Sequence, residues 1–147
     1  MEYKCNTLTQ EEVIPLLRKA ENSFDPPLSQ NIPYTVSEYA KKISDNALFI
    51  LCMEDDEIIG FTAYYLNQEG GFAYIPQIWV SDMHQRKGIG ASMMDKLIKE
   101  APAYIKSIRL EVRKNNEKAV AFYEKNGFVV FDEKNGKLLL GKVISCK

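Results

Sequence analysis

The stretch HQRKGIGASMMDKLIKEA, residues 84–101, constrains the fold more than any other part of the sequence. It follows an apolar run that ends at Val80. Beyond its two glycines, apolar residues recur at the spacing of an amphipathic helix that begins near Ile89. The pattern therefore predicts a strand, a glycine loop and a helix in direct succession. The first turn of such a helix has backbone N–H groups without helical acceptors, and these groups point at the loop.

The composition of this loop favours an anion as its ligand. Gly88 and Gly90 have no Cβ atom to keep an oxyanion away from the backbone, and Arg86 and Lys87 add positive charge suited to a diphosphate. Two other phosphate loops do not fit. The sequence has no G-x-x-x-x-G-K-[ST], and Met93 stands where a dinucleotide-binding G-x-G-x-x-G loop has its third glycine. ATP and NAD are therefore not the expected ligands.

The whole chain predicts strands and helices in the order βααβββαβαββ. Capping boxes at 9–12 and 35–38 open the first two helices, and Asn135-Gly136 marks the turn of a C-terminal hairpin. Strands are expected at 3–8, 47–53, 58–66, 71–80, 107–113 and on both sides of that turn. We therefore expect an α/β (α+β) fold with a mixed, largely antiparallel sheet flanked by helices. The strands before and after the glycine-loop helix should be parallel.

Four features between or within these elements carry further expectations. Residues 22–34 contain three prolines and predict a long loop of the kind that often has a function. The acidic turn 54–57 is expected to be a solvated hairpin tip. Gly60 is a candidate β-bulge, and Pro76 must lie at a bulge or where the sheet needs no donor.

The composition predicts one globular domain, residues 1–147, with 46% hydrophobic residues and a net charge of −1. A general binder of nucleic-acid backbones relies on excess positive charge, so nucleic acid is not an expected partner. The sequence shows no membrane-length apolar run and no signal peptide, so we expect no membrane partner. Cys5, Cys52 and Cys146 share no ligand-like spacing, which predicts no metal, no disulfide framework and a cytoplasmic location.

A second motif, IRLEVRKNNEKAVAFYEKNGF at residues 108–128, follows the glycine loop. Together the two motifs resemble the GNAT superfamily of acyl-CoA-dependent N-acetyltransferases. The resemblance is dense over residues 75–128, and the second motif is most similar to the branch that acetylates the N-terminal alanine of a ribosomal protein. The residues that match the superfamily's loop, Q/R-x-x-G-x-G/A, are Gln85, Gly88 and Gly90. Asp82 departs from the pattern, because members often have proline there.

The resemblance implies that acetyl-CoA is the co-substrate, without a metal, and that it lies between two splayed central strands. The pantetheine arm would pair with the backbone of the strand that ends at Val80, and the pyrophosphate would lie on the glycine loop. Asn116 matches an asparagine near the pantetheine, and Tyr123 matches a tyrosine near the thioester sulfur. The cofactor-binding residues implied in this way are Ile78, Trp79, Val80, Gln85, Arg86, Lys87, Gly88, Ile89, Gly90, Ala91, Asn116 and Tyr123.

Acetyl transfer to an amine needs a base, because an alkyl ammonium has a pKa near 10.4 and must lose a proton before it attacks. Glu111 alternates with the apolar residues of its strand and is the candidate base, acting through water. The alternative is a surface carboxylate paired with Arg109 or Arg113. Tyr123 is the candidate acid for the departing thiolate, and the alternative is a packed ring. His84, the single histidine, is expected to lie at the surface rather than to take part in the reaction.

The sequence leaves the acceptor open. The favoured acceptor is the primary amine of a small molecule, such as an amino sugar or another metabolite, and the alternative is the N-terminal amine of a protein. A third, non-enzymatic hypothesis is a module that only binds acyl-CoA; the presence of Glu111, Asn116 and Tyr123 speaks against it. The oligomeric state is also open, with a homodimer among the possibilities.

Overall fold

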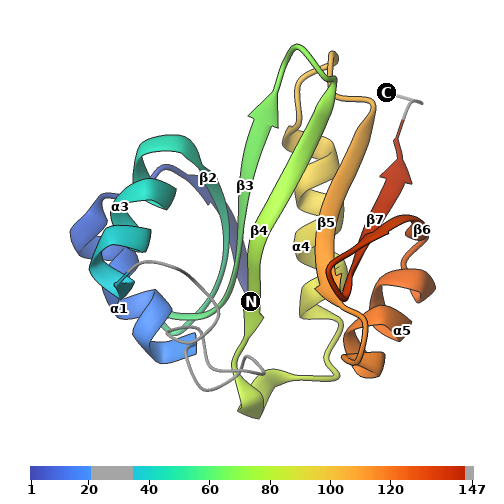
Figure 1. The fold of residues 1–147 in the computed structure, drawn as a ribbon. Coiled ribbons are helices and arrows are strands. Elements are labelled where there is room, and N and C mark those ends of the chain that lie inside the picture. Colours follow the sequence, from blue (N-terminus) through green and yellow to red (C-terminus); the bar gives the residue numbers. More distant parts are fainter. Residues whose placement is uncertain (21–34, 145–147) are drawn as a thin grey trace. The chain divides into compact units, whose positions relative to one another are not determined.

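Seven strands and four α-helices follow one another in the described part of the computed structural model, residues 1–20 and 35–144 (Figure 1). In chain order they are β1 (Glu2–Asn6), α1 (Gln10–Ala20), α3 (Val36–Asn46), β2 (Leu48–Glu54), β3 (Glu57–Asn67), β4 (Phe72–Val80), α4 (Ile89–Glu100), β5 (Ser107–Arg113), α5 (Glu117–Lys125), β6 (Val129–Lys134) and β7 (Lys137–Val143). The predicted order of elements is confirmed. The structure adds a short 3₁₀ helix, Asp82–His84, between β4 and α4.

The strands form one sheet in the order β1-β2-β3-β4-β5-β7-β6. β4 and β5 are parallel, and the recorded pairs of β1 with β2, β5 with β7 and β6 with β7 are antiparallel. The predicted fold class, with its parallel pair next to the glycine-loop helix, is therefore confirmed. The chain divides into two compact units: unit 1 is residues 1–63 and 77–97, and unit 2 is residues 64–76 and 98–147. The prediction of one domain stays a prediction, and each unit is described by itself.

In unit 1, α1 and α3 begin at the predicted capping boxes. The Thr9 hydroxyl accepts a hydrogen bond from the Glu12 N–H at 3.3 Å, and the Glu12 carboxylate accepts one from the Thr9 N–H at 3.0 Å. Thr35 and Glu38 form the same reciprocal pair, with both bonds at 3.1 Å. Each box satisfies N–H groups that the first helical turn leaves open, so both helix starts are set by local sequence.

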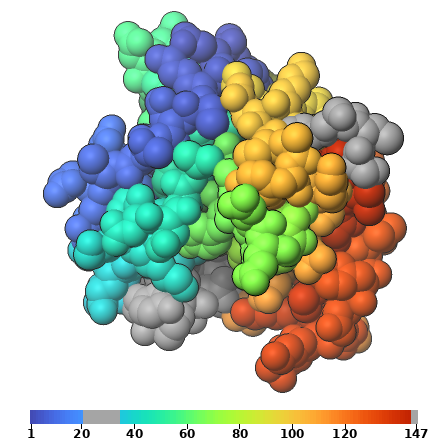
Figure 2. Space-filling view, turned by 90° about the horizontal axis from the view of Figure 1, so that it is seen from above, coloured from blue at the N-terminus to red at the C-terminus, as the bar shows by residue number. Residues whose placement is uncertain are grey.

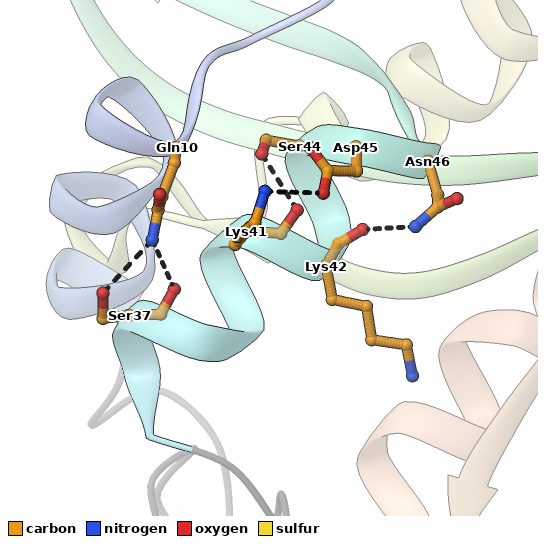
Figure 3. Close-up of polar contacts among 7 residues, drawn as sticks. All are labelled: Gln10, Ser37, Lys41, Lys42, Ser44, Asp45 and Asn46. Carbon is orange, nitrogen blue, oxygen red and sulfur yellow. Dashed lines mark hydrogen bonds and ion pairs between the residues drawn. The ribbon is translucent and has the colours of Figure 1, made fainter.

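The two helices pack side by side, as both views show (Figures 1 and 2). Their buried residues are Val13, Leu16, Leu17 and Ala20 on α1, and Tyr39, Ala40 and Ile43 on α3. At the edge of this contact Gln10 Nε2 donates to the backbone and side-chain oxygens of Ser37 at 3.0 and 3.2 Å (Figure 3). The long loop predicted at 22–34 lies outside the described residues.

The acidic turn between β2 and β3 is more than a solvated tip. Asp55 and Asp56 have φ values of 51° and 64°, as the two central residues of a type I′ hairpin turn require. The residues on either side make contacts: Glu57 Oε1 forms an ion pair with Lys19 Nζ at 2.8 Å, and Glu54 Oε2 lies 3.5 Å from His84 Nε2. The turn is exposed as expected, and the two glutamates in addition make side-chain contacts with Lys19 and His84.

Gly60 lets β3 lie close to the start of α4. A Cβ atom at Gly60 would be 3.1 Å from the Trp79 carbonyl oxygen and 3.3 Å from Ile89 Cγ2. Both distances are tighter than ordinary van der Waals contact. Ile89 is the first residue of α4, so the absence of a side chain at Gly60 helps to fix where the glycine loop enters its helix.

In unit 2, β5 presents different chemistry on its two faces. Its alternate residues Ile108, Leu110 and Val112 are buried, whereas Arg109 and Glu111 are exposed, as the period of two predicts. The predicted Asn135-Gly136 turn joins β6 to β7 with φ values of 53° and 78°. β6 has a bulge between Val130 and Asp132, and all six of its residues are exposed.

Pro76 coincides with the end of the parallel pairing between β4 and β5. The recorded pairs run from Phe72↔Ser107 to Ile75↔Leu110 and stop there, although β4 extends to Val80. Proline has no N–H to donate to a neighbouring strand, so Pro76 lies where this ladder needs no donor. The expectation for Pro76 is confirmed in that form.

We expect Gly60→Ala to lower the free energy of unfolding by about 1–3 kcal/mol, the usual cost of overpacking a filled site. The added methyl group meets a backbone oxygen, which cannot move as a flexible side chain would. Urea unfolding measures the effect. An unchanged midpoint would show that α4 shifts at no cost and would contradict this account.

Candidate functional site

In unit 1, the glycine loop begins with a turn that its own side chains hold. Gln85 Nε2 donates hydrogen bonds to the Val80 carbonyl oxygen and to Asp82 Oδ1, both at 3.3 Å. Asp82 is the residue that departs from the family pattern, and it here provides an acceptor for Gln85, which matches that pattern. The start of the loop is therefore held by hydrogen bonds from Gln85, and not by a proline at position 82.

The centre of the loop exposes backbone N–H groups. Arg86 and Gly88 both have positive φ, 68° and 75°, and the first recorded helical bond of α4 runs from the Ser92 N–H to the Gly88 carbonyl at 2.9 Å. The N–H groups of residues 89–91 therefore have no acceptor within the helix. No atom lies within 4 Å of where a Gly88 Cβ would be, and Arg86 and Lys87 are exposed. This arrangement suits an anion with several oxygens, as the sequence predicts.

His84 holds the loop to the β2–β3 hairpin. Its side chain is only 18% exposed, and Nε2 lies 3.5 Å from the Glu54 carboxylate. Nδ1 is buried and has no hydrogen-bond partner among the described residues. The expectation that His84 lies at the surface was therefore wrong. The contact between His84 and Glu54 joins segments that are thirty residues apart, so no local sequence pattern indicates it.

The last residues of β4 present a strand edge. The Ser81 N–H donates to the Ile59 carbonyl at 2.8 Å, so this residue faces β3. Backbone groups alternate in direction along a strand, so those of Ile78 and Val80 point to the opposite edge. The Trp79 ring is buried and packs on Phe61 with ring centroids 6.0 Å apart. Trp79 therefore anchors the strand through its side chain.

In unit 2, Glu111 lies on the exposed face of β5. Its side chain is 40% exposed, and its Oε2 lies 4.0 Å from Lys137 Nζ. The sequence analysis considered Arg109 or Arg113 as surface partners of this carboxylate, but the recorded ion pair is with Lys137. An exposed pair at this distance contributes little to stability.

Asn116 and Tyr123 both have structural contacts on α5. Asn116 is the N-cap, and its Oδ1 accepts from the Ala119 N–H at 3.2 Å. Its amide nitrogen makes no hydrogen bond with the described residues. Tyr123 is 7% exposed and packs edge-to-face on Phe122 and Phe128, with centroids 5.2 and 5.6 Å away. Burial raises the pKa of Tyr123 far above its usual value, so the hydroxyl is neutral at pH 7 and can donate a hydrogen bond.

The comparisons with known proteins identify the family. Residues 14–128 match the model of the Acetyltransferase (GNAT) family. The chain belongs to the GNAT acetyltransferase family. This confirms the resemblance, and acetyl-CoA is accordingly the co-substrate of this acetyltransferase.

The solved structures similar to this GNAT chain agree in fold. The PaiA N-acetyltransferase of Thermoplasma acidophilum, in complex with coenzyme A, has a TM-score of 0.72 at 22% identity, over 97% of this chain and 99% of that one. smu.2055 of Streptococcus mutans gives 0.77 at 18%, over 98% and 99%. The ribosomal-protein-S18-alanine N-acetyltransferase of Escherichia coli gives 0.69 at 20%, over 99% and 96%. No curated protein matched the sequence.

The structure also shows groups near Glu111 that the sequence analysis did not select. Tyr74 lies opposite Arg109 in the β4–β5 register and stacks on Tyr65, with centroids 6.4 Å apart and rings 6° from parallel. Burial, and to a smaller extent the charge of Glu111, raises the pKa of Tyr74 to about 12. The alternation of Phe72 and Tyr74 in the sequence signals an aromatic strand face. Their position beside Glu111 depends on strand register, which no local pattern encodes.

A cation–aromatic stack lies next to this tyrosine pair in the GNAT chain. The Arg109 guanidinium carbon lies 4.2 Å from the Phe72 ring centroid and 5.6 Å from that of Phe131. Gly141 lies opposite Arg109 on β7, and the Phe131 ring occupies the space above it. Arg109 is thus fixed between two rings and keeps its charge on the face that carries Glu111.

The described residues of this acetyltransferase show neither a metal-binding cluster nor a membrane-spanning helix. No group of three or more His, Cys, Asp or Glu side chains among them could hold a metal ion. None of the described helices combines the length and apolarity needed to cross a membrane.

We expect Tyr74 and Tyr123 to ionise last in an alkaline titration followed by phenolate absorbance. Their folded-state pKa values, about 12 for Tyr74 and higher for Tyr123, exceed the unfolded value near 10. The stability that their neutral forms contribute is fully present below pH 10 and is lost as the pH rises through about 12. Tyr74→Phe and Tyr123→Phe should each remove one late-titrating group. Loss of an early-titrating group instead would contradict the burial argument.

Proposed function

We propose that this GNAT chain transfers an acetyl group from acetyl-CoA to the primary amine of a small molecule, by direct attack in a ternary complex. The observation that carries the proposal is the glycine loop. Its open backbone N–H groups at residues 89–91, beside Arg86 and Lys87, suit the pyrophosphate of acetyl-CoA. The family then supplies the reaction type, and Glu111 supplies a group able to take the proton.

The cofactor would contact three parts of the chain. The pyrophosphate would lie on residues 85–91, and the pantetheine arm would pair with the strand edge at Ile78 and Val80, where the Val80 carbonyl already accepts a hydrogen bond from Gln85. That edge offers both donors and acceptors, as an added strand would need. The unused Asn116 amide nitrogen would donate to a pantetheine carbonyl.

Starting from the ammonium form, the reaction requires two protons to leave the nitrogen and one proton to reach the sulfur. We propose that Glu111, directly or through a water molecule, accepts the proton of the ammonium form. The free amine nitrogen then forms a bond to the thioester carbonyl carbon, and the carbon–sulfur bond breaks. The nitrogen of the adduct loses its second proton, and the departing sulfur, which keeps the electron pair of the broken bond, takes up one proton and leaves as the thiol. The neutral Tyr123 hydroxyl would donate a hydrogen bond to that sulfur as negative charge develops on it.

The choice of a small molecule rests on what lies around Glu111. Arg109 lies two residues from Glu111 on β5, and the Tyr74 ring lies beside Arg109 on the neighbouring strand β4. Such closely spaced groups suit an acceptor of a few atoms. The second candidate is a protein N-terminal amine, which the similarity of the 108–128 segment to the ribosomal-protein branch favours. Thiol release from acetyl-CoA with a panel of small amines and of short peptides would distinguish the two.

A cytoplasmic location is part of the proposal. Neither Cys5 nor Cys52 is in a disulfide, as expected of a protein kept in a reducing compartment. Burial raises the pKa of the Cys52 thiol, which keeps it protonated and protects it from oxidation. Fractionation of cells that express a tagged chain would test this, and recovery outside the cytoplasmic fraction would refute it.

We expect Glu111→Gln to lower turnover by about 10²- to 10⁴-fold at neutral pH, the usual contribution of a positioned base. Glutamine keeps the shape but cannot accept the proton. Turnover should recover in part as pH rises and the amine loses its proton unaided. Glu69→Gln, at an exposed turn, is the matched control and should leave the rate unchanged. Wild-type rates in Glu111→Gln across neutral pH would return Glu111 to a surface role.

We expect Tyr123→Phe to keep the fold and to lose turnover, because it removes only the hydroxyl. The ring can still pack on Phe122 and Phe128, so the melting temperature should change little. Turnover at saturating substrates should fall by about 10²-fold or more, with the acetyl-CoA affinity nearly kept. Tyr123→Ala should lose both activity and about 3–5 kcal/mol of stability. Near-normal turnover in Tyr123→Phe would leave Tyr123 with packing alone.

A further inference from the structure

The neighbours of Glu111 on the exposed face of unit 2 differ in what they can offer to an amine. On β7, Leu139 lies opposite Glu111, and its side chain has no polar atom. Arg109, two residues earlier on β5, and Lys137, 4.0 Å from the Glu111 carboxylate, carry hydrogen-bond donors and no acceptor. An ammonium group needs acceptors and is repelled by cations. These three side chains therefore cannot bind an ammonium group beside the proposed base.

Tyr74 is the neighbour of Glu111 on the side of β4. It lies opposite Arg109 in the β4–β5 register, on the same face, so it is the diagonal neighbour of Glu111. Cα atoms on such a diagonal are about 7–8 Å apart, a distance that aromatic and long side chains can span. The recorded β4–β5 pairs stop at Ile75↔Leu110, one residue short of Glu111. Tyr74 is therefore the last β4 residue that the ladder fixes on this face next to Glu111.

The ring of Tyr74 is held in place, and its hydroxyl has no partner in the described part of the chain. Tyr65 on β3 stacks on the ring, with centroids 6.4 Å apart and the rings 6° from parallel. The side chain is half-buried, yet its hydroxyl makes no hydrogen bond with the described residues. The charge of Glu111 contributes to the raised pKa of Tyr74, so the two groups interact electrostatically. The hydroxyl is therefore neutral at pH 7 and can accept one hydrogen bond.

Asp132 also carries a carboxylate on this face, but it lies farther from Glu111. It is opposite Leu139 on β6, so β7 separates it from β5. Two strand spacings amount to about 10 Å. Its Oδ1 already accepts a hydrogen bond from the Glu133 N–H at 2.8 Å. Of the described side chains next to Glu111 in the register, Tyr74 thus supplies the neutral oxygen.

We propose that Tyr74 is an acceptor-binding residue, whose hydroxyl oxygen accepts a hydrogen bond from the amine while Glu111 takes its proton. This inference rests on the proposed function, in which Glu111 is the base. The ammonium form has three N–H groups, so it can donate to the carboxylate and to the Tyr74 oxygen at the same time. The Tyr74 hydroxyl keeps its own proton throughout and serves to position the nitrogen.

The hydrogen bond to Tyr74 matters most after the first proton has left. The ammonium form is attracted to the carboxylate, and this attraction ends once the proton has moved and both groups are neutral. The bond to the Tyr74 oxygen involves a neutral group and persists. It holds the nitrogen in place while the new lone pair turns towards the thioester carbon, and such positioning favours attack.

Binding is measured first, because it does not require turnover. The protein, labelled with ¹³C at the Cζ atom of its tyrosines and saturated with coenzyme A, is titrated with n-butylamine, 2-phenylethylamine and D-glucosamine. These probes share a primary amine and differ in the rest of the molecule. We expect at least one of them to shift the signal that Tyr74→Phe removes, and to leave the Tyr104 signal in place. No shift with any of the three, or an equal shift of Tyr65 from stacking of the ligand, would overturn the inference.

Kinetics then separate positioning by Tyr74 from proton transfer by Glu111. Tyr74→Phe keeps the ring and its stacking, so the melting temperature should change little. We expect the KM for the best of the three amines to rise about two- to tenfold, as loss of one neutral hydrogen bond allows, with kcat within a factor of two. The KM for acetyl-CoA should stay the same. Tyr104→Phe, which removes an exposed hydroxyl between α4 and β5, is the matched control and should change none of these values.

The outcomes separate this inference from the proposed function. An unchanged KM for the amine in Tyr74→Phe would overturn the binding role of Tyr74, while the acetyltransferase reaction would stand. A rise in the KM for acetyl-CoA alone would assign Tyr74 to the cofactor and also overturn the inference. A loss of kcat as large as that of Glu111→Gln would assign Tyr74 to proton transfer, with the same result. Shifts of the Tyr74 signal without thiol release from any amine would support the amine site and refute the proposed reaction.

Discussion

The close approach of α4 to Gly60 is the contact on which the anion-binding loop depends. It brings the first residue of α4 against β3. Residues 81–88, which include the 3₁₀ helix, connect the end of β4 to this point. With the helix start fixed in this way, its open N–H groups have a fixed direction and need no reorganisation to meet an anion. The Gln85–Asp82 and His84–Glu54 contacts then hold the loop at its entry.

Local signals in the sequence predicted most of the fold, and non-local contacts account for what was missed. Both capping boxes, the Asn135-Gly136 turn and the glycine loop are encoded within a few residues, and all four formed as expected. Gly60 is a candidate bulge from the sequence, which stays a prediction, and the structure adds its close packing against residues 79 and 89. That role depends on how distant segments pack. The same holds for the Lys137–Glu111 pair, which needs the β5–β7 register.

The candidate catalytic groups show how structural and chemical roles combine in single residues. Asn116 caps α5 through its oxygen and leaves its nitrogen for another partner. Tyr123 packs in the core of unit 2, and the same burial keeps its hydroxyl protonated. The sequence presented packing and catalysis as alternatives for Tyr123, yet burial of the ring does not exclude hydrogen bonding by the hydroxyl. A buried phenol with a raised pKa is better suited to donating a hydrogen bond than to giving up its proton outright.

The bulge in β6 has a consequence for how this protein behaves at high concentration. β6 is the last strand of the sheet and exposes Val129, Val130 and Phe131, which would make a flat strand prone to pairing with another molecule. The bulge leaves Phe131 outside the ladder, with its half-exposed ring over Gly141, and the rest of the strand is the charged run 132–134. The irregular backbone interrupts the row of unpaired backbone N–H and C=O groups, and the charged side chains disfavour pairing with a strand of another molecule. The edge is thereby protected against aggregation by features that also fix Arg109.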